Sequence, residues 1–135
     1  MNKTLRNVLA GIAGFVVIMV VLSSLEGLLP KLVSLPPAPA NTQDTAAWQA
    51  YVAAMPVEAL LLLIANYAVA GFAGGYVAAA LAAKPAPARL PWVMAILFTA
   101  AGVFNLYMLQ HPIWVGAACL IVQFVSPHLG YRLRK

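Results

Sequence analysis

Five polar side chains at the ends of long apolar runs could carry chemistry if the fold brings them together. Glu26 lies late in the first apolar run, Glu58 begins the second, and Asn105, Gln110 and His111 surround the junction of the third and fourth. Two carboxylates and an imidazole can bind a divalent metal ion, relay protons or act in acid and base catalysis. No helical spacing such as His-x-x-x-His supports a metal site, so the sequence leaves both metal and cofactor unknown.

Each of these side chains also has a structural interpretation. Glu58 would be favoured at the positive end of its own helix dipole, and His111, which precedes Pro112, would be a loop residue. Glu26 is an ionisable group within an apolar run, and such groups tend to face the protein interior because solvating them in lipid is costly. It could therefore act in a site, or it could pair with Lys31 or with an amide at the same end.

Three amide side chains lie deeper within the apolar runs: Asn66, Asn105 and Gln123. Side-chain amides in membrane spans usually join neighbouring helices by hydrogen bonds. The alternative is that they line a polar path between helices, as in a transporter or channel.

The elements that must position these residues are transmembrane helices. The chain has 135 residues, of which 64% are hydrophobic and 8% charged, whereas about 25% of residues are charged in a soluble domain. A span needs about 20 predominantly apolar residues, and four runs meet this requirement: 5–29, 57–83, 91–109 and 113–133. The sequence therefore predicts a single all-α domain, a four-helix transmembrane bundle, with the first run retained as a helix rather than cleaved as a signal peptide.

Prolines and polar residues predict where these helices begin and end. Pro30 should end the first helix, and Pro127 should bend or end the last. Between the first two spans, Asn41 or Thr42 is a candidate N-cap for a short helix over residues 43–54. Its aromatic residues suit the boundary between membrane and water, so this helix is expected to lie on the bilayer surface or to pack on the end of the bundle.

The basic residues predict the orientation of the spans. Four spans place both termini on one side, together with seven of the eight basic residues: Lys3, Arg6, Lys84, Arg89, Arg132, Arg134 and Lys135. Lys31 alone falls on the other side. The positive-inside rule then places both termini in the cytoplasm. Because orientation explains the net charge of +5, binding of nucleic acid is excluded as an explanation.

Small residues recur at helical spacing and predict close helix contacts. Gly71 and Gly75 lie one turn apart, as do Ala70 and Gly74, and Gly14 follows Ala10 by the same interval. Such spacing lets two backbones approach closely and gain dispersion contact. The pattern fits contacts within one chain and contacts between copies equally well.

Taken together, these features resemble uncharacterised small bacterial inner-membrane proteins with four spans. The resemblance rests on the late acidic residue of span one, the proline-rich outer loop, Gly74-Gly75 and His111-Pro112-x-Trp114. It implies a bacterial inner membrane and carries over no activity. Because packing signals are rich and catalytic signals absent, we expect a non-enzymatic component that binds membrane lipid or a protein partner, or forms a homo-oligomer. A transporter with a polar path and a membrane enzyme or metal site at the outer end are the alternatives.

Overall fold

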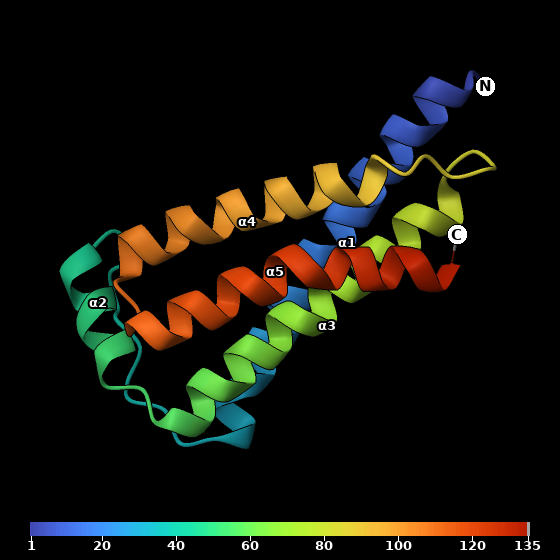
Figure 1. The fold of residues 1–135 in the computed structure, drawn as a ribbon. Coiled ribbons are helices and arrows are strands. Elements are labelled where there is room, and N and C mark those ends of the chain that lie inside the picture. Colours follow the sequence, from blue (N-terminus) through green and yellow to red (C-terminus); the bar gives the residue numbers. More distant parts are fainter. Residues whose placement is uncertain (135) are drawn as a thin grey trace.

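Helices account for all the regular structure in residues 1–134, the part of the chain that the computed structural model describes. In chain order they are α1 (Lys3–Leu32), α2 (Thr45–Ala53), α3 (Val57–Leu81), α4 (Leu90–Leu109) and α5 (Ile113–Arg134) (Figure 1). α2 is short, and the other four helices are long and apolar enough to cross a membrane. The prediction of an all-α chain with four helices of spanning length and a short helix between the first two is confirmed.

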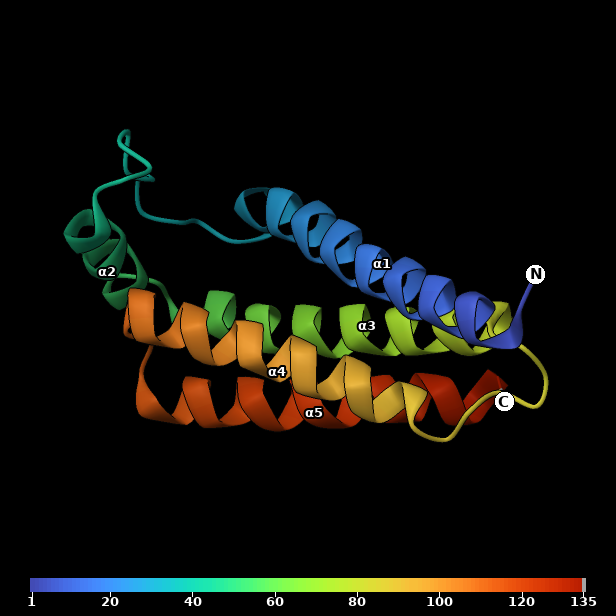
Figure 2. The same ribbon diagram turned by 90° about the horizontal axis from the view of Figure 1, so that it is seen from above.

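α3 is the central helix and packs against both α1 and α5. α4 packs mainly on α5 and makes fewer contacts with α1. Figure 2 shows the reason, because the second half of α1 diverges from α4. The buried residues of α1 form a single narrow stripe at every fourth position: Ala10, Gly14, Ile18 and Leu22. A stripe this narrow can pack against only one neighbouring helix along its full length, and that helix is α3.

The crossing of α1 and α3 is a contact between two glycines. A Cβ atom added at Gly14 would lie 2.6 Å from the Gly74 carbonyl oxygen, and one added at Gly74 would lie 2.6 Å from the Gly14 oxygen. Real Cβ atoms do not approach backbone oxygen this closely, so only glycine permits this separation of the two helices. The small residues at this crossing therefore join helices of the same chain.

Glycine residues also permit the close contact of α3 with α5. Gly75 lies against the backbone of Pro127, and Gly130 lies against the backbone of Phe72 and Tyr76. Gly71 faces the side chains of Ser126 and Phe98.

The end of one helix differs from the sequence prediction. α1 passes through Pro30 and ends at Leu32, because the proline removes only one helical hydrogen bond and the Val33 amide still donates to the Leu29 carbonyl at 3.1 Å. α5 also passes through an internal proline, Pro127, and continues to Arg134, close to the predicted end of the span at residue 133. Burial of the proline between α5 and its neighbours keeps the helix in place despite the missing donor.

α2 begins later than predicted. Its N-cap is Asp44, whose side chain accepts a hydrogen bond from the Ala47 amide at 3.0 Å. Asn41 instead closes a preceding turn by accepting from the Gln43 amide at 2.9 Å. Asp is as good an N-cap as Asn, so the turn at Asn41 decides which of them is used.

The long helices have a basic end and an end that carries all the acidic side chains. Both ends of the described chain lie at the first, here called the terminal end (Figures 1 and 2), and α2 lies at the other, the α2 end. The terminal end carries six basic residues: Lys3, Arg6, Lys84, Arg89, Arg132 and Arg134. Glu26, Asp44 and Glu58 lie toward the α2 end with Lys31. Lys135, the seventh basic residue in the charge pattern, lies outside the described residues.

Candidate functional site

Glu26 lines a small groove between α1 and α3. This groove, of about 140 Å³, includes Asn66 and is otherwise formed by leucine, valine and alanine side chains. One turn earlier on α1, the Leu22 carbonyl accepts a hydrogen bond from Asn66 Nδ2 at 3.2 Å. The Oδ1 atom of Asn66 is buried and has no partner. Glu26 is thus placed beside the Asn66 amide, in a groove that none of the other four candidate residues lines.

Asn105 joins α4 to α3 by a hydrogen bond from its Nδ2 to the Tyr67 hydroxyl at 3.3 Å. The Tyr67 ring is buried and packs against Phe98 at a centroid distance of 5.9 Å. Sequence reasoning missed Tyr67 as the partner. The signal was available, because a buried tyrosine needs a partner for its hydroxyl, and Tyr67 lies in a span that also contains Asn66.

Gln110 lies at the α2 end in a cavity formed by α2 and the last turn of α4. It caps α4 in the left-handed conformation, with φ 50°, and lines a cavity of about 370 Å³ with Thr45, Gln49 and Tyr107. Gln49 of α2 donates from Nε2 to the Met108 carbonyl at 3.0 Å. The last carbonyls of a helix lack helical partners, so α2 is held in place partly by completing the end of α4.

His111 lies in the connection between α4 and α5. Its side chain is half-buried, and its Nδ1 atom is buried without a hydrogen-bond partner. Burial lowers the pKa of His111 below its ordinary value because desolvation disfavours the charged imidazolium. Burial therefore favours the neutral form of the ring.

Glu58 lies in the first turn of α3 and is exposed. There the carboxylate is favoured by the positive end of the helix dipole. Pro56, the N-cap residue of α3, makes no side-chain capping bond. Stabilisation of the helix start is thus a sufficient role for this residue.

The five candidate residues make no direct hydrogen bonds to one another in the described part of the chain. Across residues 1–134, no three His, Cys, Asp or Glu side chains lie close enough together to hold a metal ion. The hydrogen bond of Asn105 to Tyr67 and that of Gln49 beside Gln110 are separate structural contacts.

Deeper in the protein, Gln123 lies at the contact of α4 with α5. It is 1% exposed, its amide packs on Gly102, and its Oε1 atom has no partner. The hydroxyls of Ser126 and Thr99 are likewise buried and unpartnered. These polar groups lie on the facing helices α4 and α5, and Ser126 also packs against Gly71 of α3.

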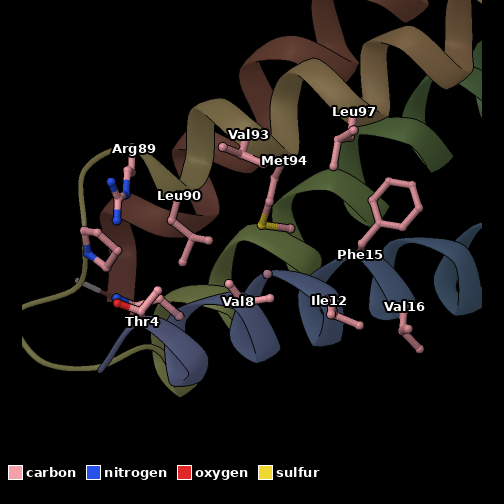
Figure 3. Close-up of a pocket in the computed structure, with 13 residues that line it drawn as sticks. Thr4, Val8, Ile12, Phe15, Val16, Arg89, Leu90, Val93, Met94 and Leu97 are labelled. Atoms are coloured by element: carbon pink, nitrogen blue, oxygen red, sulfur yellow. The ribbon is translucent and has the colours of Figure 1, made fainter. Parts of the chain in front are cut away.

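A feature that the sequence does not reveal is a groove of about 410 Å³ between the first halves of α1 and α4, here called the α1–α4 groove. Its apolar walls come from both helices: Val8, Ile12, Phe15 and Val16 on α1, and Leu90, Val93, Met94 and Leu97 on α4. Figure 3 shows Leu90 and Met94 projecting toward α1. Its volume falls within the range of about 300–1,000 Å³ that is usual for ligand pockets.

Comparison with known proteins gives no relative from which a role could be carried over. No family model matches the chain, and neither a curated protein nor a solved structure shows significant similarity to it.

Proposed function

We propose that this chain is a small multi-pass membrane protein that acts as a non-enzymatic binding component, and that its binding surface is the α1–α4 groove. One observation carries the proposal. The groove is a ligand-sized apolar cavity, whereas the titratable side chains of residues 1–134 form no metal-binding group. A cavity with such walls holds its occupant mainly by apolar contact.

The setting of this function is the second part of the proposal. The chain would form a four-helix bundle in a bacterial inner membrane, with both termini in the cytoplasm. The basic residues of the terminal end support this orientation, because cytoplasmic loops carry an excess of Lys and Arg. α2 would lie on the opposite membrane surface, where the half-buried rings of Trp48 and Tyr51 suit the interface.

Photo-crosslinking tests the binding function. A benzophenone amino acid replaces Val93, which lines the groove, or Ile96, which does not. The two side chains are 50% and 58% exposed on the same helix, so they are a matched pair. After bulk lipid has been exchanged for detergent, irradiation should give an adduct of defined mass at position 93 and none at position 96. Equal yields at both positions would mean that the groove is ordinary lipid-facing surface.

A second candidate function is a transporter or channel for a small solute or ion. It is favoured by the buried and unpartnered polar atoms of Gln123, Ser126 and Thr99 between α4 and α5. Flux of protons and monovalent cations into liposomes tests this function. A flux above that of empty liposomes that is abolished in Gln123→Leu would establish the transporter and displace the binding function.

A further inference from the structure

The α1–α4 groove is polar at one end and apolar at the other. Thr4, Asn7 and Arg89 line it at the terminal end, and Phe15, Val16 and Leu97 line it deeper in the spans. Figure 3 shows Arg89 and Thr4 at one end of the groove and Phe15 at the other. An occupant that fits this gradient has a polar head at the membrane surface and an apolar chain directed into the bilayer.

Arg89 is the basic residue that lines the groove. Arg6 donates from Nε to the Leu81 carbonyl at 2.9 Å, and Lys84 donates from Nζ to the Ala79 carbonyl at 3.1 Å. Both side chains therefore donate hydrogen bonds to backbone carbonyls in the last turn of α3. The Arg89 side chain has no hydrogen-bond partner within residues 1–134, and it lines the groove.

The positive charge around Arg89 favours a ligand with an anionic head group. The three acidic residues of the chain lie toward the α2 end: Glu26 late in α1, Asp44 at the N-cap of α2 and Glu58 in the first turn of α3. Arg89 is also the N-cap residue of α4, so the positive end of that helix dipole adds to its charge. An Arg guanidinium binds phosphate oxygens with two parallel hydrogen bonds.

We propose that the α1–α4 groove holds one anionic phospholipid, with its phosphate at Arg89 and an acyl chain between the apolar walls of α1 and α4. This inference rests on the proposed binding function and names its ligand. The two walls approach closely at Gly11, since a Cβ atom added there would lie 3.3 Å from the Leu90 side chain.

Native mass spectrometry with two lipids of equal chain length, phosphatidylglycerol and phosphatidylcholine, tests this inference. The full chain should retain phosphatidylglycerol in preference to phosphatidylcholine. Arg89→Gln should reduce that preference by about fivefold, the effect of one basic residue near an anionic surface. Arg132→Gln is the matched control, because it removes the same charge at the same end from an exposed residue that does not line the groove.

A second pair of variants tests the position of the acyl chain. Val8→Trp fills the groove and should abolish retention of both lipids. Val20→Trp is the control, because Val8 and Val20 are 54% and 57% exposed on the same helix and only Val8 lines the groove.

Each contrary result has a separate meaning. Equal retention of the two lipids by the unmodified chain, or an unchanged preference in Arg89→Gln, would overturn the anionic ligand while the groove remained a binding site. If Val8→Trp and Val20→Trp retained lipid equally, the groove would not be the binding site, and the proposed function would be wrong.

Discussion

Replacement of Gly75 by alanine should separate α3 from α5. The added Cβ would collide with the backbone of Pro127, and backbone cannot move aside as the end of a flexible side chain can. Relief requires the two helices to separate, and overpacking of this kind costs about 1–3 kcal/mol. Alanine also offers about 1 kcal/mol of helix propensity over glycine. The change in unfolding free energy measured for this substitution alone therefore underestimates the cost of the collision.

Gly27→Ala supplies the matched control, because an added Cβ at that helical position meets nothing within 4 Å. Both variants gain the same propensity, so the difference between their free energies of unfolding isolates the collision at about 1–3 kcal/mol. Unfolding by sodium dodecyl sulfate in mixed micelles, followed by circular dichroism, measures both. If the two variants agree within about 0.5 kcal/mol, the size of a neutral surface change, α3 and α5 do not make the contact described here.

Three further predictions concern hydrogen bonding, pH and topology. Tyr67→Phe should lower the free energy of unfolding by about 1 kcal/mol, because it removes the hydroxyl that Asn105 contacts and leaves the ring in place; an unchanged midpoint in the same detergent titration would refute it. Burial lowers the pKa of His111, so the unfolded chain binds a proton more readily than the folded chain, and stability should be lost as pH falls through the ordinary value of 6.5. Thermal unfolding at several pH values measures this loss, which should be smaller in His111→Asn. An equal dependence of stability on pH in both proteins would contradict the prediction. An impermeant thiol reagent should label a cysteine placed at Asn41 from outside the cell and leave one at Ala86 unlabelled, and the opposite pattern would reverse the orientation.

The sequence predicted the long helices well because their signal is length and composition. An apolar run of spanning length, closed by prolines or basic residues, has few alternatives in a membrane. The helix boundary at Pro30 was harder to predict. A proline removes one hydrogen bond, and whether the helix survives depends on the contacts around it, which a single sequence does not state.

The polar residues could be ranked by depth but not paired. Residues at similar depth can lie on helices that do not touch, and the direction of each side chain depends on helix rotation and tilt. Glu26 and Asn66 share a groove because α1 packs on α3, whereas Asn105 finds Tyr67 because α4 lies near α3 at that depth. Depth alone favoured neither of these pairs over the cluster with Gln110 and His111.

The α1–α4 groove follows from packing that serves other purposes. The stripe of buried residues on α1, centred on Gly14, directs that helix against α3. At the terminal end the Asn7 side chain accepts a hydrogen bond from the Ala83 amide at 2.9 Å, which holds the start of α1 beside the end of α3. α4 is held mainly by α5, and its Val93 side chain, which lines the groove, is 50% exposed. The groove is therefore built between two well-anchored helices, and a ligand would bind there without requiring either of them to move.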